Sequence, residues 1–140
     1  MLIQTKNKKL DTKQTQGNVR AFFEQELPII MAQAHINYID LKSPIIDDMP
    51  RSRHVGNAMD NKATNYIQAR QWLKEIIEAI KYVPEKPRQF LKYRYLDNLT
   101  WTQVEVRSGY SRKRGQDLIN DGFIYFANSF IDTYDFRVWQ

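Results

Sequence analysis

Residues 112–120 include five side chains that could read the edges of nucleic-acid bases. An α-helix fits the major groove of B-form DNA, and residues near its N-terminal end reach the base edges. Arg and Lys can pair with guanine, Gln and Asn with adenine, and Asp can accept a hydrogen bond from cytosine. We expect all five side chains to lie on one exposed face of a helix. They are Arg112, Lys113, Gln116, Asp117 and Asn120.

The helix that holds these residues is predicted to begin after Ser111, whose hydroxyl can cap its first turn. Leu118, Ile119 and Phe123 follow at helical spacing and form the expected buried side, opposite the polar face. Three consecutive cations, at residues 112–114, occupy the first turn. Cations at a helix N-terminus oppose the helix dipole, so this cluster favours an anionic partner.

Two further helices are predicted before this one. Thr100 and Gln103 form a Thr-x-x-Gln capping box, which satisfies otherwise unpaired N–H groups at a helix start. Gly109 can adopt the left-handed conformation that closes a helix. An earlier helix is expected over residues 88–96, with Phe90, Leu91 and Tyr95 in the core and Tyr93 and Leu96 at its flank. Three short helices with a tight glycine turn are typical of a helix-turn-helix.

The basic charge of the chain is concentrated on this motif and near the N-terminus. The 140 residues have a net charge of +5. Residues 81–114 contain nine Lys or Arg against three acidic residues, and residues 1–20 contain five against one. This distribution is the footprint expected of a nucleic-acid-binding protein. Six side chains are candidates for contacts with the DNA backbone: Arg88, Arg94, Arg107, Arg114, Thr100 and Ser111.

The chain is predicted to be all-α, with N-terminal helices and one long helix packed on the basic lobe. We expect a flexible basic arm (1–16), an N-terminal helical region (17–83) with a loop (43–56), a helix-turn-helix lobe (84–128) and an aromatic C-terminal extension (129–140). The extension is too apolar for a free tail. It should therefore pack on the body of the protein or on a partner chain.

The N-terminal region is predicted to contain helices near 17–26 and 28–40, because Pro28 disfavours helical geometry at the preceding residue. His35 lies on or beside the apolar stripe of the second helix, and we expect it to be a hydrogen-bonded packing residue. A long helix should begin at Asn57. Its apolar stripe consists of Ala69, Leu73, Ile76, Ile77, Ile80 and Val83.

Composition argues against several functional classes. The chain has no cysteine, which excludes thiolate metal sites and cysteine nucleophiles. Asp47, Asp48 and His54 share one loop, but too few groups converge there for a metal site. We see no catalytic constellation and expect no enzyme activity, metal or cofactor. No apolar run reaches the roughly 20 residues of a membrane span, and no signal peptide is evident, so we expect a soluble cytoplasmic protein.

The segment RYLDNLTWTQVEVRSGYS resembles the helix-turn-helix in the fourth conserved region of bacterial sigma factors. More broadly, residues 43–128 resemble the ArpU-type phage transcriptional regulators, and the arrangement is also similar to that of RinA-type phage late activators. The loop SPIIDDMPRSRHVGN, the long helix and the Tyr-Ser pair before the last helix support this likeness. The resemblance implies a phage or prophage regulator that binds promoter DNA, with Ser111 as a helix cap and residues 112–120 as the DNA face.

Three residues depart from the pattern of such motifs. Glu105 stands where a small residue usually packs against the third helix, Ser108 where leucine is common, and Gly115 where a β-branched residue often packs. We expect either a different packing of the lobe or an altered helix angle. In the first case Trp101, Val104 and Val106 would compensate.

Three hypotheses follow from the sequence. The first is a sequence-specific regulator that binds double-stranded DNA, with a DNA-recognising subunit of a phage packaging machine as a variant. The second is a protein-interaction module that docks on host RNA polymerase without reading DNA. The third is a nuclease, for which no catalytic constellation is visible. A homodimer is compatible with each of them.

Overall fold

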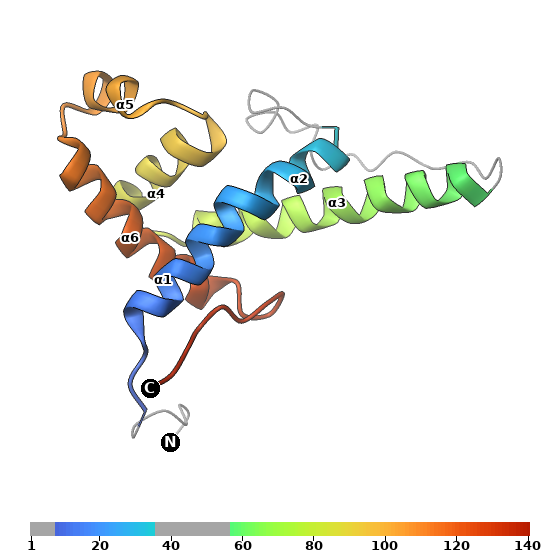
Figure 1. Cartoon of the computed structure of the whole chain (residues 1–140), viewed down its shortest axis with the longest axis horizontal. Helices are drawn as coiled ribbons and strands as arrows, with labels where there is room; N and C mark the ends of the chain where they lie inside the picture. The colour runs from blue at the N-terminus through green and yellow to red at the C-terminus, as the bar shows by residue number, and fades with distance from the viewer. Residues whose placement is uncertain (1–7, 36–56) are drawn as a thin grey trace.

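The computed structural model describes residues 8–35 and 57–140, and within α3 it places side chains from Thr64 onward. These residues are mostly helical and include no β-strand, so the prediction of an all-α fold is confirmed. Figure 1 shows their arrangement. In chain order the elements are α1 (Thr12–Ala21), the π-helical turn η1 (Phe22–Glu26), α2 (Leu27–Gln33), α3 (Asn57–Lys81), α4 (Glu85–Leu91), the π-helical turn η4 (Lys92–Leu96), α5 (Trp101–Ser108) and α6 (Arg112–Ser129).

Helix α1 begins earlier than the sequence pattern indicated. Asp11 caps the helix, and its side chain accepts a hydrogen bond from the backbone N–H of Gln14 at 3.0 Å. Thr15 is fully buried. The prediction of a flexible arm over 1–16 is therefore wrong from Thr12 onward, because Asp11 supplies a cap that the apolar pattern alone does not reveal. The rest of the predicted arm before Lys8 lies outside the described residues.

The predicted break at Pro28 is also wrong. Helices α1 and α2 form one continuous rod through η1, in which the N–H of Leu27 donates to the carbonyl of Phe22 (Figure 1). The π-helical turn places Pro28 at the start of α2, where a missing N–H is tolerated. Helix α2 ends at Gln33 rather than near residue 40, and His35 has a positive φ of 55°.

Helix α3 is the long helix expected from the apolar stripe, and Figure 1 shows it extending away from the lobe formed by α4, α5 and α6. Five of the six predicted stripe residues are buried, and Ile77 is partly buried. Helix α2 packs along α3, and Ser129 of α6 donates a hydrogen bond to the carbonyl of Ala79 at 2.9 Å. The expectation for His35 is met only in part: its side chain is exposed, but its ring packs against that of Tyr66, with the ring centres 4.9 Å apart.

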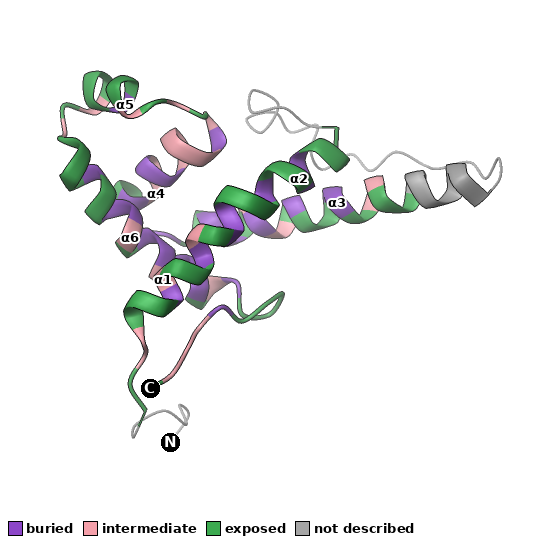
Figure 2. Ribbon diagram, in the orientation of Figure 1, coloured by how far each residue is buried: buried purple, intermediate pink, exposed green. Residues whose placement is uncertain are grey.

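A cluster of phenylalanine rings joins the N-terminal rod to α6 and the C-terminal segment. Phe126 is fully buried, and four other rings lie between 4.7 and 6.5 Å from it. Figure 2 shows that buried residues concentrate where α1, α3 and α6 meet. The C-terminal extension therefore packs on the body of its own chain. The five rings of this cluster are Phe22, Phe23, Phe126, Phe130 and Phe136.

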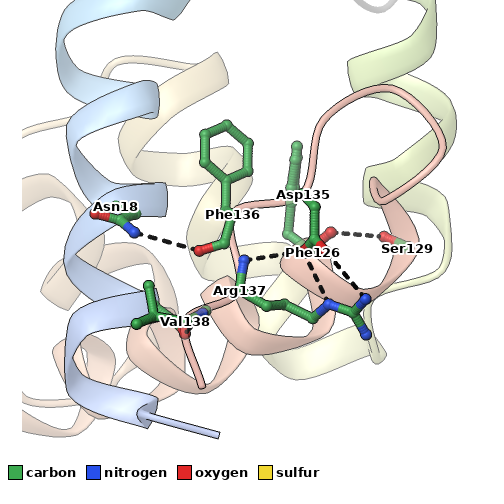
Figure 3. A network of polar contacts seen from close by, with 8 residues as sticks. Asn18, Phe126, Ser129, Asp135, Phe136, Arg137 and Val138 are labelled. Carbon is green, nitrogen blue, oxygen red and sulfur yellow. Dashed lines mark hydrogen bonds and ion pairs between the residues drawn. The ribbon is translucent and has the colours of Figure 1, made fainter. Parts of the chain in front are cut away.

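The C-terminal segment is also hydrogen-bonded to the start of α1 (Figure 3). The N–H of Asp11 donates to the carbonyl of Val138 at 2.7 Å, and the N–H of Val138 donates to the Thr15 hydroxyl at 3.0 Å. Asn18 donates to the carbonyl of Phe136 at 3.3 Å. These bonds hold the first two turns of α1 in place beside α6.

The lobe formed by α4, η4, α5 and α6 has its own apolar centre. Phe90 and Leu91 are buried, as expected, and Val104 and Ile119 are buried beside them. Leu96, expected at the flank, is buried as well. Tyr95, expected in the core, stays partly exposed. The sequence pattern assumed an α-helix through residue 96, whereas the π-helical turn η4 shifts which side chains face inward.

Candidate nucleic-acid interface

Helix α6 presents four of the five predicted base-reading residues together. Ser111 caps the helix, since its hydroxyl accepts a hydrogen bond from the N–H of Arg114 at 3.1 Å. The four side chains are exposed and line one shallow hollow that is open to solvent. The first two turns of α6 therefore form a single polar surface that a large anionic partner could reach. Its members are Arg112, Lys113, Gln116 and Asp117, called here the α6 polar face.

The charges on this face are only weakly engaged within the protein. Lys113 and Asp117 form an ion pair at 3.7 Å, and both side chains are more than half exposed. An exposed pair one helical turn apart contributes a few tenths of a kcal/mol. Arg112 lies against the ring of Trp101, with its guanidinium carbon 5.8 Å from the ring centre. Neither the ion pair nor the contact with Trp101 would strongly oppose binding of these side chains to a partner.

Asn120 does not belong to this face, contrary to the prediction. Its side-chain oxygen accepts a hydrogen bond from Arg20, and its backbone carbonyl accepts one from Gln16 at 3.1 Å. The guanidinium of Arg20 also lies 5.3 Å from the centre of the Phe123 ring. Asn120 has the helical phase of the polar face, but α1 covers α6 at that level. The available face therefore ends about two turns into the helix.

Two of the three residues that depart from the expected motif, Glu105 and Ser108, form hydrogen bonds near the start of α6. The Glu105 carboxylate accepts a hydrogen bond from the N–H of Arg112 at 3.0 Å, so α5 supplies a second cap to α6. The Ser108 hydroxyl accepts one from the N–H of Tyr110 at 3.1 Å, within the turn that joins the two helices. Gly109 in that turn has the predicted left-handed conformation, with φ of 75°. Both polar residues thus stabilise the turn that precedes α6 and the first turn of the helix.

Gly115, the third departure, reflects close packing between helices. A Cβ atom at this position would lie 2.9 Å from the Trp101 ring and 3.0 Å from the Phe90 ring. The two aromatic rings occupy the space that a β-branched residue would need, so the lobe does pack differently from the expected pattern. Trp101 and Val104 contribute to this packing, whereas Val106 does not, because it is 82% exposed.

The candidate backbone-contacting arginines divide into two groups. Arg88 donates to the carbonyl of Lys81 at 3.1 Å, and Arg94 donates to that of Leu99 at 2.7 Å. These two side chains hold the ends of neighbouring helices. Arg107 and Arg114 are exposed, although the Arg107 guanidinium lies 6.0 Å from the Tyr93 ring.

The two candidate hydroxyl groups are both helix caps. Thr100 accepts a hydrogen bond from the N–H of Gln103 at 3.2 Å, and the Gln103 side chain accepts one from the N–H of Thr100 at 2.9 Å. The predicted capping box is therefore confirmed. Ser111 has the corresponding role at α6. Each hydroxyl uses its oxygen as an acceptor and keeps its proton available for an anionic group.

Sequence reasoning missed three residues that shape the interface. The Trp101 ring contacts two guanidiniums, whose carbon atoms lie 4.8 Å (Arg94) and 5.8 Å (Arg112) from the ring centre. Its place directly after the Thr100 cap was a usable signal. Gln16 and Arg20 contact α6 from about a hundred residues earlier in the chain, so no local pattern could have revealed them.

No group of three or more His, Cys, Asp or Glu side chains among the described residues is arranged to hold a metal ion. The loop residues Asp47, Asp48 and His54 lie outside the described ranges. None of the described helices combines the length and apolar character needed to cross a membrane.

The chain is similar over most of its length to a protein of Enterococcus hirae. It is 26% identical over 125 residues, or 88% of this chain and 90% of the other, to a protein of Enterococcus hirae named "Putative autolysin regulatory protein ArpU". No protein-family model matches the sequence. No solved structure matches it either. The similarity extends over most of both chains, which supports the resemblance to ArpU-type proteins.

Proposed function

We propose that this protein is a sequence-specific DNA-binding regulator of transcription, which inserts the N-terminal half of α6 into the major groove. The observation that carries the proposal is the α6 polar face. It offers two cations, an amide and a carboxylate in the first two turns of an exposed helix. These groups match the donors and acceptors of base edges in the major groove.

The surrounding lobe supports this assignment in two ways. Helix α5 ends at Gly109 and leads through a short turn into α6, whose first turn is capped from both Ser111 and Glu105. A recognition helix needs such rigid positioning because base contacts depend on its orientation in the groove. The exposed Arg107 and Arg114 lie near this helix start and suit contacts with phosphates.

We further propose that the target genes belong to a phage or prophage. This step depends on the likeness to ArpU-type and RinA-type regulators and on the name of the similar Enterococcus hirae protein, an autolysin regulatory protein. The likeness of α4, α5 and α6 to the fourth region of sigma factors belongs to the same proposal. Bacterial cytoplasm is the expected location for such a regulator.

The test is selection of bound fragments from the parent genome, with an Arg112→Ala/Lys113→Ala double variant as control. We expect the wild type to enrich a small set of promoter fragments, with binding that weakens steeply as salt increases. The double variant should lose this enrichment while keeping its helical circular dichroism. Equal enrichment by both proteins would contradict the proposed groove contact. Retention of RNA polymerase without any DNA binding would instead favour a protein-interaction module.

A further inference from the structure

Gly17 lies in the interior of a helix, where glycine is one of the least favourable residues. The rod continues through α1, η1 and α2, so this position is not a helix end. Gly115 and Gly122 have neighbouring side chains that leave no room for a Cβ atom, which explains both glycines. At Gly17, by contrast, a Cβ atom would meet nothing within 4 Å. No contact with another described residue therefore accounts for the glycine at this position.

The surroundings of Gly17 are basic and polar. Lys13 is one turn before it and Arg20 one turn after it, so the three residues share a face of α1. Lys8 and Lys9 are exposed just ahead of the helix. Hydrogen bonds hold this segment against the C-terminus, including one from the N–H of Gln140 to the carbonyl of Lys9 at 2.7 Å. Two acidic side chains bound the region: Asp11, which caps α1, and Glu24, one turn beyond Arg20.

This face of α1 is joined directly to the recognition helix. Gln16 and Arg20 both donate hydrogen bonds to Asn120, at the point where the α6 polar face ends. Asn120 has the same helical phase as that face and lies about one turn beyond Asp117 on α6. Helix α1 is therefore the next surface that an elongated partner would meet after passing over residues 112–117.

We propose that α1 is a second DNA-contacting element, and that Gly17 is glycine so that the sugar–phosphate backbone can approach the helix closely. Glycine is commonly used where a ligand comes close to a protein backbone. Lys13 and the lysines ahead of α1 would contact phosphates next to this approach, without reading sequence. The inference depends on the proposed function, because it assumes that α6 occupies the adjacent groove.

Three substitutions at matched positions test this idea on the full-length protein and a selected DNA fragment. Gly17→Gln should raise the thermal midpoint, because glutamine is a better helix former and the site is open. The same variant should weaken DNA binding by about tenfold, an effect of the size expected for displaced phosphate contacts. Gly17→Ala should also raise the midpoint but weaken binding less. Ala32→Gln is the control, because it adds the same side chain to an exposed position about 22 Å further along the rod.

The salt dependence of DNA binding tests the role of α1 independently, through variants that remove one positive charge. Lys13→Gln should reduce affinity for all DNA sequences alike and lower the slope of log affinity against log salt by about one. Lys74→Gln on α3 makes the same charge change at another exposed lysine and should leave the slope unchanged.

The outcomes separate the two proposals. If wild-type protein does not bind duplex DNA, the proposed function fails, and this inference fails with it. If the wild type binds, and Arg112→Ala/Lys113→Ala abolishes binding, but Gly17→Gln and Lys13→Gln bind like wild type, only the role of α1 is overturned. Weakened binding by both α1 variants, with both controls unaffected, supports it.

Discussion

The two halves of α6 have opposite relations to the rest of the protein. In the first two turns, from Arg112 to Asp117, every residue except Gly115 is exposed. Beyond Asp117 most residues face the core, and Phe126 contacts rings from the N-terminal rod and the C-terminal segment. Figure 2 shows this change along the helix. One helix therefore divides into a surface for a partner and an anchor for the fold.

This division predicts that substitutions in the second half of α6 affect stability most. Phe126→Ala should lower the free energy of unfolding by about 3–5 kcal/mol, because it leaves a cavity among four aromatic neighbours. Urea unfolding followed by circular dichroism would measure the loss. Tyr125→Ala is the control at the adjacent, 48% exposed position, where a much smaller change is expected. Similar losses for both variants would contradict the assignment of Phe126 to the centre of the core.

A substitution on the buried side of the first two turns of α6 should have an intermediate effect on stability. Gly115→Val forces a side chain against Trp101 and Phe90 and should lower the free energy of unfolding by about 1–3 kcal/mol. Gly17→Val provides the comparison, since its site is open and its stability should change by no more than about 0.5 kcal/mol. If the two variants are equally stable, the tight packing of α6 on Trp101 is refuted. Thermal or urea unfolding would distinguish them.

The helix cap that Glu105 provides to α6 is expected to contribute less to stability than the packing of Phe126 or Gly115. Glu105→Ala removes the acceptor for the N–H of Arg112 and should cost about 1 kcal/mol of stability, as for other helix caps. Glu105→Gln keeps an oxygen at the same place and should retain part of that contribution. Hydrogen exchange of the Arg112 amide would show the local effect directly. An unchanged exchange rate in Glu105→Ala would rule out the cap.

The smallest expected effect on stability concerns an ion pair in the C-terminal segment. Arg137 hydrogen-bonds to Asp135 through its side chain and its backbone, which lowers the pKa of this carboxyl below its ordinary value. A lowered pKa stabilises the fold above the unfolded-state pKa and loses that contribution as pH falls through the folded-state value. Asp135→Asn should therefore cost a few tenths of a kcal/mol at pH 7, since the Asp135 side chain is 46% exposed, and progressively less as the pH falls through the folded-state pKa of this carboxyl. A difference from wild type that persists at low pH would exclude this ion pair as its source.

Local chemistry made part of this structure predictable. The capping box at Thr100, the left-handed Gly109 and the Ser111 cap depend on a few neighbouring residues, and all three are present. The stripe of α3 follows helical periodicity alone. These features made it possible to predict where α6 begins and which side of its first two turns is exposed.

Long-range contacts explain what the sequence could not reveal. Asn120 has the correct helical phase for the polar face but bonds to Arg20, a hundred residues earlier. The early start of α1 involves the C-terminal segment, whose Val138 carbonyl accepts the N–H of Asp11. The continuous rod through Pro28 needs a π-helical turn, which periodicity does not signal.

The central claim is that the exposed side chains of the α6 polar face bind DNA without supporting the fold. It is tested most directly by measuring affinity and unfolding on the same preparation of Arg112→Ala/Lys113→Ala. We predict that affinity for a selected promoter fragment falls by about tenfold or more, since each good base contact contributes roughly 1–3 kcal/mol. The free energy of unfolding should stay within about 0.5 kcal/mol of wild type. Unchanged affinity, or a loss of binding that merely follows a loss of stability, would contradict the claim.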